Sequence, residues 1–194
     1  MTRFFAILSR MRYIPRWALM RNTRQENLSE HSYDVAVLAH LLAELDNRRF
    51  GGQVSVERCV LAALYHDAPE IFTGDLPTPV KHGNTALHDA YRVVEQHAAD
   101  RLLSYLPDDL RGGWAPYVRE ELRPEEAAVV KAADKLSALI KCIEEETQGN
   151  REFAAAKVAT EASLRAMQMP CVDCFLTEFL PAYSLTLDEQ ERPL

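Results

Sequence analysis

Two histidines and two aspartates in this chain are of the types that a metal site needs. His31 lies in the first turn of a predicted helix, His66 and Asp67 are adjacent at the end of the next helix, and Asp134 lies in an otherwise apolar helix. A single histidine on a helix is more often structural than a ligand. Together, two imidazoles and two carboxylates suit a divalent ion such as Mn²⁺, Co²⁺, Fe²⁺ or Mg²⁺. Four protein ligands also leave positions for water and a substrate oxygen, which metal-assisted hydrolysis requires.

A possible anion contact lies near the start of the chain. Residues 1–25 contain six arginines and neither Asp nor Glu. Arg16 is the strongest candidate because Pro15 and Trp17 flank it and should fix its place, and a planar guanidinium matches two phosphate oxygens at once. An acid-free, Arg-rich start is also typical of transit peptides. Because serine is sparse here, we interpret the segment as the first helix of the mature domain.

The elements that must position these residues are all predicted to be helices. Glycine is scarce, at 7 residues, and apolar residues recur at helical spacing. Asn27 with Glu30 forms a capping-box pattern, Ser55 is a second N-cap, and Pro69 should break the chain after His66. Residues 73–81 are predicted to form an irregular loop. The remaining helices are expected over residues 2–14, 85–106, after Pro107, and over 124–147, 152–167 and 172–180. These features predict an all-α fold with a single domain over residues 1–194.

Composition limits the partners of the chain. The 194 residues carry a formal net charge of −7, which argues against a nucleic acid polymer or an anionic membrane as the main partner. No stretch has the length of a membrane span and no secretory signal is visible, so we expect a cytoplasmic protein with reduced cysteines.

Several segments together resemble one known family. They are RW (16–17), NLSEHS (27–32), YHDAPE (65–70), TGDLPTPVK (73–81) and KAADKL (131–136). The order H…HD…D on successive helices is similar to that of the HD-domain metal-dependent phosphohydrolases, and the longer segments resemble the bacterial HD-domain 5′-deoxynucleotidases. The resemblance runs nearly end to end. The HD dipeptide alone is unspecific, whereas the HDAxE…TGDLPTPVK pattern is highly specific.

The resemblance implies an HD-type helical bundle that releases phosphate from deoxyribonucleoside 5′-monophosphates, with one divalent metal ion and usually a homodimer. It implies that the metal ligands are His31, His66, Asp67 and Asp134. Arg16 would meet the phosphate with Trp17 beside it, and Glu70 and Asp75 would be catalytic carboxylates that do not hold the metal. The residues expected to bind or face the substrate are Arg16, Trp17, His31, Asp67, Asp75, Leu76, Pro77, Thr78 and Asp134.

Two questions about roles stay open at this stage. Glu70 either takes a proton from the attacking water or orients it. Asp75 either serves the departing 5′-oxygen or holds a sugar hydroxyl. Trp17 and the loop 76–78 are plausible walls against a ribose 2′-hydroxyl. Pro69 departs from the small residue expected in relatives, which is tolerated if the helix already breaks there.

Other functions remain as alternatives. The same scaffold would serve a nucleoside triphosphate or cyclic-nucleotide phosphohydrolase, a non-catalytic nucleotide-binding module, or a two-metal oxygenase. The four candidate ligands, Glu70 and Asp75 are all present, which disfavours the non-catalytic module. The other histidines are predicted to have surface or packing roles, so one metal is expected; they are His40, His82, His88 and His97.

Overall fold

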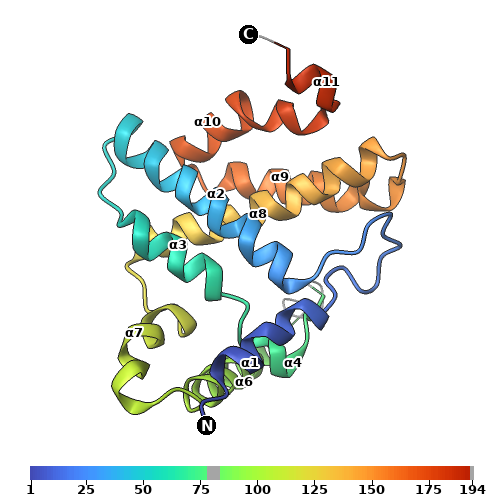
Figure 1. Cartoon of the computed structure of the whole chain (residues 1–194). Helices are drawn as coiled ribbons and strands as arrows, with labels where there is room; N and C mark the ends of the chain where they lie inside the picture. The colour runs from blue at the N-terminus through green and yellow to red at the C-terminus, as the bar shows by residue number, and fades with distance from the viewer. Residues whose placement is uncertain (78–83, 193–194) are drawn as a thin grey trace.

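The computed structural model describes residues 1–77 and 84–192, and in this part the chain is built of helices (Figure 1). The all-α prediction is confirmed, because the described residues hold no strand beyond one isolated bridge between Pro15 and Asn27. No helix in this part of the chain has the length and apolar content needed to cross a membrane. The α-helices are α1 (Phe4–Leu8), α2 (Leu28–Arg49), α3 (Val56–Tyr65), α4 (Glu70–Thr73), α6 (Thr85–Leu103), α7 (Asp108–Val118), α8 (Pro124–Thr147), α9 (Ala154–Ala166), α10 (Pro170–Glu178) and α11 (Leu187–Gln190). Three 3₁₀ turns are η1 (Ser9–Tyr13), η2 (Arg151–Phe153) and η3 (Leu180–Ser184).

The predicted capping box fixes where α2 begins. The Asn27 side chain accepts hydrogen bonds from the backbone N–H groups of Ser29 and Glu30 at 3.0 and 3.1 Å. Glu30 in turn accepts from the Asn27 N–H at 3.2 Å. Because these caps satisfy the first free N–H groups of the helix, α2 starts at Leu28 and His31 lies in its first turn.

The helix is interrupted after α3, as Pro69 in the sequence predicts. Helix α3 ends at Tyr65 and α4 begins at Glu70, directly after Pro69. Proline has no N–H to donate and its ring clashes with the carbonyl four residues back in a continuous helix. His66 and Asp67 therefore lie in the turn between the two helices, and Glu70 starts a new direction.

Some helix ends differ from the predicted ones. The helix predicted over residues 2–14 is α1 followed by the 3₁₀ turn η1, and the one over 152–167 is η2 followed by α9. Helix α6 ends at Leu103, because Tyr105 and Leu106 donate to carbonyls three residues back and tighten the chain before Pro107. Helix α10 begins at Pro170, which suits a first helical position, and ends before Pro181. The short helix α11 was not predicted.

The buried apolar side chains form two clusters. The first, here the upper core, lies between α2, α3, α8 and α10 and includes Val35, Leu42, Ala63, Leu136 and Phe175. The second, the lower core, joins α1, α6 and the end of α7 and includes Phe4, Leu28, Ala68, Leu102 and Val118. In Figure 1 the elements of the lower core occupy the bottom of the view, below α2 and α8.

Both candidate metal-binding histidines lie where the two cores meet. Helix α2 passes from Leu28 in the lower core to Val35 in the upper core, with His31 between them. The chain after α3 passes from Ala63 in the upper core to Ala68 in the lower core, with His66 between them. Packing of the two cores therefore holds both imidazoles at one junction.

Glu126, in the first turn of α8, ties that helix to the start of α3 and should make stability depend on pH. Its fully buried side chain accepts from Arg58 Nε at 3.1 Å and from Arg123 Nε at 3.0 Å. Burial alone would raise the pKa of Glu126, but the hydrogen bonds from the two arginines lower it from 4.5 to about 2. A carboxyl group whose pKa is lower in the folded than in the unfolded protein stabilises the fold at pH values above its unfolded pKa. This contribution is lost as pH falls from about 4.5 towards 2.

Glu126→Gln is therefore expected to lower the free energy of unfolding at neutral pH and to matter progressively less in acid. Chemical denaturation of both proteins at a series of pH values measures the difference. A difference that stays constant down to the acid limit would contradict the assignment.

Candidate active site

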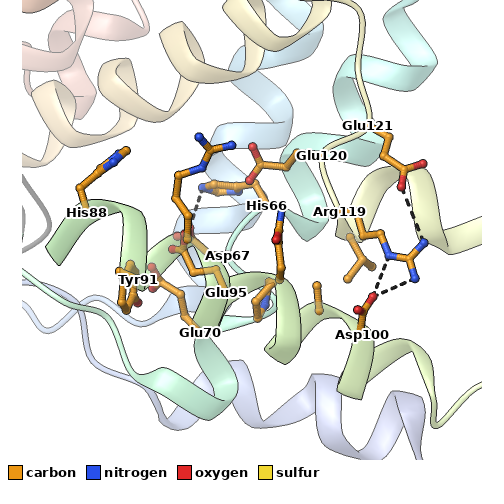
Figure 2. A pocket seen from close by; sticks show the side chains of 15 residues that line it. His66, Asp67, Glu70, His88, Tyr91, Glu95, Asp100, Arg119, Glu120 and Glu121 are labelled. Carbon is orange, nitrogen blue, oxygen red and sulfur yellow. Dashed lines mark hydrogen bonds and ion pairs between the residues drawn. The ribbon is translucent and has the colours of Figure 1, made fainter. Parts of the chain in front are cut away.

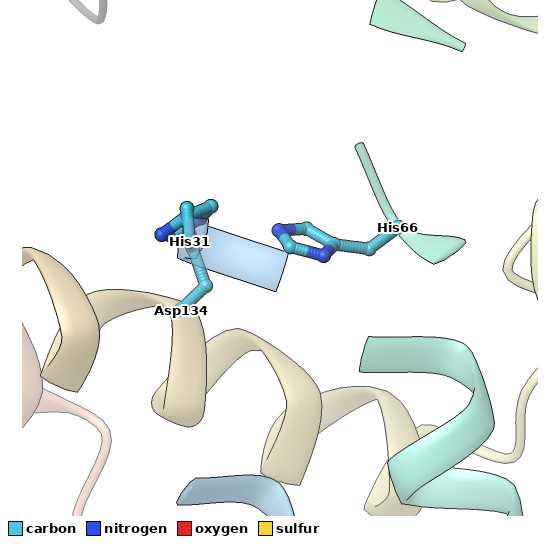
Figure 3. A group of neighbouring side chains, drawn as sticks. All are labelled: His31, His66 and Asp134. Carbon is cyan, nitrogen blue, oxygen red and sulfur yellow. The ribbon is translucent and has the colours of Figure 1, made fainter. Parts of the chain in front are cut away.

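Three side chains from three separate elements meet at the junction of the two cores. They are His31 in α2, His66 after α3, and Asp134 in α8, and one ligand atom of each lies within 4.8 Å of the others. His31 Nε2 is 3.1 Å from Asp134 Oδ1. Figure 3 shows the His66 ring pointing toward His31 and Asp134. The structure thus brings together three of the four residues predicted to bind a metal. The four residues His31, His66, Asp67 and Asp134 are here called the metal group.

Asp67, the fourth predicted ligand, lies beside both imidazoles. Its Oδ1 is 3.3 Å from His66 Nε2 and its Oδ2 is 3.5 Å from His31 Nε2. The same Oδ2 accepts a hydrogen bond from Arg16 Nη1 at 3.2 Å. Asp67 therefore connects the predicted metal ligands with the predicted anion contact.

Hydrogen bonds on the far side of each ring set which nitrogen can act as a ligand. His66 Nδ1 lies 2.7 Å from the carbonyl oxygen of Ala63, which only accepts, so Nδ1 carries the proton. His31 Nδ1 lies 3.1 Å from the Ser137 hydroxyl. The two Nε2 atoms are buried and face carboxylate oxygens, that of His31 toward Asp134 and that of His66 toward Asp67. This is how ligating histidines are usually oriented.

The charges of the group fit a bound cation. Burial alone would lower the pKa of His66, but the Asp67 and Asp134 carboxylates raise it above the ordinary value. Burial would raise the pKa of Asp67, yet His66, His31 and Arg16 hold it below its ordinary value, and the pKa of Asp134 is lowered in the same way. Imidazole lone pairs facing ionised carboxylates repel unless a proton or a metal ion lies between them. The donor set therefore fits a divalent metal ion.

Arg16 and Trp17 lie at the edge of this group. The Arg16 side chain is only 12% exposed and reaches Asp67 on one side and Glu26 on the other. Trp17 adopts a left-handed backbone conformation with φ of 55°, and its ring centroid lies 5.3 Å from that of Phe153. A bulky residue with positive φ is rare and often marks a functional site.

A cavity of about 660 Å³ opens from the metal group on the side of Trp17. The predicted site residues that line it are Arg16, Trp17, Asp75, Leu76, Pro77 and Asp134. Its size is that of a pocket for a small organic ligand. Thr78, the last residue predicted for this side, lies outside the described residues.

A second cavity, of about 850 Å³, adjoins the metal group at His66 and Asp67 and shares no lining residue with the first (Figure 2). His66, Asp67 and Glu70 line it, together with residues that were not predicted. Glu70 is buried, with 3% of its surface exposed. The two carboxylates predicted to be catalytic are therefore brought to the same centre but into different cavities, Glu70 into this one and Asp75 into the other.

Sequence reasoning missed the residues of the far wall of this second cavity. His88, Tyr91 and Glu95 line it from α6, and their spacing of three and four residues, which places them on one helix face, is the signal that could have revealed them. The sequence predicted only a surface or packing role for His88. Glu120, which Figure 2 shows beside His66, follows the end of α7 with φ of 53°. No sequence pattern indicated that position.

Two further residues contact the candidate site residues from outside the two cavities. Ser137 lies one helical turn after Asp134 and contacts the His31 ring, as described above. Glu26 accepts a hydrogen bond from Trp17 Nε1 at 2.9 Å and lies 3.5 Å from Arg16 Nε. Neither residue carries a motif of its own, so only the tertiary structure identifies them.

The family model and two related sequences that match this chain carry the description 5′-deoxynucleotidase. Residues 3–183 match the family model described as 5′-deoxynucleotidase YfbR-like. The 5′-deoxynucleotidase of Citrobacter koseri is 49% identical, with 98% of each chain covered. The 5′-deoxynucleotidase YfbR of Salmonella paratyphi B has the same identity and coverage.

Solved structures agree with the fold. An HD-domain phosphohydrolase from Listeria innocua superposes with a TM-score of 0.80 at 25% identity, over 93% of this chain and 88% of that one. The cyanophage S-2L HD phosphohydrolase DatZ, solved with dA and one catalytic Zn²⁺ ion, superposes with a TM-score of 0.67 at 19% identity, over 93% and 96% of the two chains.

Proposed function

The chain belongs to the YfbR-like 5′-deoxynucleotidase family, and we propose that its two histidines and two aspartates hold one divalent metal ion for the hydrolysis of deoxyribonucleoside 5′-monophosphates to deoxyribonucleoside and phosphate. The observation that carries this proposal is the close group of His31, His66 and Asp134 beside a cavity of small-molecule size. The names of the relatives at 49% identity support the same reaction.

The metal would be held by His31 Nε2, His66 Nε2, Asp67 and Asp134. When bound, the ion would make a water more acidic and draw charge from the phosphoryl group. The His66 Nδ1–H would donate to the Ala63 carbonyl oxygen, and a proton on His31 Nδ1 would be donated to the Ser137 hydroxyl. The one catalytic Zn²⁺ in the cyanophage structure supports a single divalent ion. Mn²⁺, Co²⁺, Fe²⁺ and Mg²⁺ also suit this ligand set.

Arg16 would bind the phosphate group. Its Nη1 already lies 3.2 Å from Asp67 Oδ2, so the guanidinium sits at the metal group, and its planar fork would donate hydrogen bonds to two phosphate oxygens. Glu26 and Asp67 hold the guanidinium from two sides, which limits the freedom it would lose on binding.

One cavity would hold the attacking water and the other the leaving nucleoside. In phosphoryl transfer the attacking and leaving oxygens lie roughly in line, on opposite sides of the phosphorus. Glu70 lies in the cavity away from Asp75 and would take the proton of the attacking water. Asp75 lies in the cavity with Trp17, where the nucleoside would sit, and would serve the departing 5′-oxygen or the sugar.

The nucleoside would occupy the 660 Å³ cavity between Trp17 and the segment Leu76–Pro77. Trp17 would stand where a 2′-hydroxyl would have to fit, so ribonucleotides would be disfavoured by steric conflict. We also propose that residues 1–194 act as one HD-type domain. The homodimer stays a prediction, which light scattering of the purified protein would check.

Phosphate release tests the proposal directly. The protein is stripped with chelator, and Mn²⁺, Co²⁺, Zn²⁺ or Mg²⁺ is added back with deoxy- and ribonucleoside 5′-monophosphates, deoxynucleoside triphosphates or cyclic nucleotides. We expect metal-restored release of orthophosphate from the deoxy monophosphates. Pyrophosphate or tripolyphosphate from triphosphates, or turnover of cyclic nucleotides alone, would favour another phosphohydrolase. Nucleotide binding without turnover would indicate a binding module.

A further inference from the structure

We propose that Glu26 is a positioning residue that fixes Trp17 and Arg16 relative to one another and thereby sets the preference for deoxyribonucleotides over ribonucleotides. The inference rests on the proposed function above. It adds a residue outside the recognised motifs to the determinants of sugar specificity.

One carboxylate oxygen of Glu26 serves both residues. Its Oε2 accepts the indole N–H of Trp17 at 2.9 Å and lies 3.5 Å from Arg16 Nε. The other oxygen, Oε1, lies 3.9 Å from His31 Nδ1. The Glu26 side chain is 13% exposed, so these contacts are largely shielded from water. One carboxylate oxygen thus binds the indole through a hydrogen bond and the guanidinium through an ion pair.

The backbone of Glu26 also holds the segment that carries Arg16 and Trp17. Its carbonyl oxygen accepts a hydrogen bond from the Arg16 N–H at 2.9 Å. The segment that carries Arg16 and Trp17 is therefore tied to Glu26 through both main chain and side chain.

Trp17 needs such support because its backbone conformation is unfavourable. With φ of 55°, this bulky residue lies in the left-handed region. The Trp17 carbonyl accepts from the Met20 N–H at 2.9 Å and from Asn22 Nδ2 at 3.2 Å. The ring of Phe153 packs on the indole. A conformation of this kind persists only while its surroundings hold it, and the Glu26 hydrogen bond is the polar contact that orients the ring itself.

Glu26 would act without touching the nucleotide. It is not among the residues that line the cavity of Trp17 and Asp75, nor among those of the cavity of Glu70. Its side chain contacts Trp17, Arg16 and His31, so its effect on the nucleotide must pass through these residues. A change at Glu26 should therefore alter sugar selectivity through the placement of Trp17.

The test compares kcat/KM for deoxyadenosine and adenosine 5′-monophosphates in Glu26→Ala, Glu26→Gln and Trp17→Phe. Glutamine keeps an oxygen that accepts the indole N–H, so Glu26→Gln should keep the deoxy/ribo ratio near that of the wild type. Glu26→Ala should lower the ratio about tenfold, the effect of losing one buried hydrogen bond of about 1.4 kcal/mol. Trp17→Phe, which lacks the indole N–H, should lower it in the same direction. Adding Glu26→Ala to Trp17→Phe should lower it little further.

Glu152→Ala is the matched control for general loosening of the segment. Glu152 accepts from the Arg21 backbone N–H at 3.1 Å and from Arg21 Nε at 2.6 Å, so its hydrogen bonds go to a different part of the segment from those of Glu26. Its substitution should leave the ratio unchanged. An equal fall of the ratio in Glu152→Ala, or an unchanged ratio in Glu26→Ala, would overturn the proposal.

Fluorescence separates this inference from the proposed function. The chain has 2 tryptophans, so a Trp114→Phe background reports Trp17 alone, with chelator present and without turnover. Glu26→Ala should shift the emission to longer wavelength and increase quenching by acrylamide, whereas Glu26→Gln should do neither. If the wild type releases no phosphate, the proposed function fails, yet this measurement still decides whether Glu26 positions Trp17. An unchanged spectrum in Glu26→Ala would refute that role.

Discussion

Replacing Asp67 with asparagine is expected to lower kcat/KM for metal-dependent phosphate release by about 10³-fold or more. Asp67 contacts His31, His66 and Arg16 at 3.5, 3.3 and 3.2 Å. Asparagine keeps the shape but removes the negative charge, so the site loses an anionic ligand and Arg16 loses the ion pair that its Nη1 makes. The metal content per chain should fall together with the activity.

The matched control is Asp173→Asn, an exposed aspartate on α10. It makes the same chemical change away from the site and should leave metal content and turnover unchanged. Phosphate release is followed after chelation and metal addition, and bound metal is measured by elemental analysis. Full metal occupancy with normal turnover in Asp67→Asn would exclude Asp67 as a ligand.

Replacing Glu145 with alanine is expected to lower the free energy of unfolding by about 3–5 kcal/mol. This buried carboxylate pairs with the buried ammonium of Lys141, four residues earlier in α8. It also accepts from the Thr23 N–H at 2.9 Å, from the Thr23 hydroxyl at 2.7 Å and from Asn150 Nδ2 at 2.8 Å. Alanine would leave the Lys141 charge buried without its carboxylate and would release the segment that carries Arg16 and Trp17.

The double variant Lys141→Met with Glu145→Gln separates these two effects. It removes both charges and leaves an amide oxygen to accept from Thr23, so it should cost less than Glu145→Ala alone. Denaturant unfolding of the three proteins provides the comparison. Equal losses in the single and the double variant would mean that the buried charge of Lys141 is not the cause.

The local signals in the sequence predicted the helices and most of the metal group. Asn27, Ser55 and Pro69 act on their own neighbours in the chain, so the starts of α2 and α3 and the break before α4 could be inferred without tertiary information. The pairing of His31 with Asp134 was predicted from residue type and resemblance, and the structure confirms that they meet.

The rest of the site depends on contacts between distant segments. Glu26, Ser137 and Glu120 carry no motif, and their roles arise only when the segment before α2, the helix α8 and the end of α7 pack around the imidazoles. The left-handed conformation of Trp17 is likewise imposed by its surroundings, since its neighbours in sequence do not require it. That Glu70 and Asp75 face different cavities follows from the packing of α4 and α6, which sequence spacing does not determine.

Helix α8 carries four of the polar residues described above at spacings of three, four and four positions. Asp134, Ser137, Lys141 and Glu145 therefore share one face of the helix, and that face meets both His31 and the segment around Thr23. During synthesis, when the amino-terminal part of a chain emerges first, the arginine and both histidines appear long before this face. A nascent chain therefore cannot bring the four proposed ligands together until α8 has left the ribosome. Activity is delayed by this order of assembly until most of the polypeptide has been made.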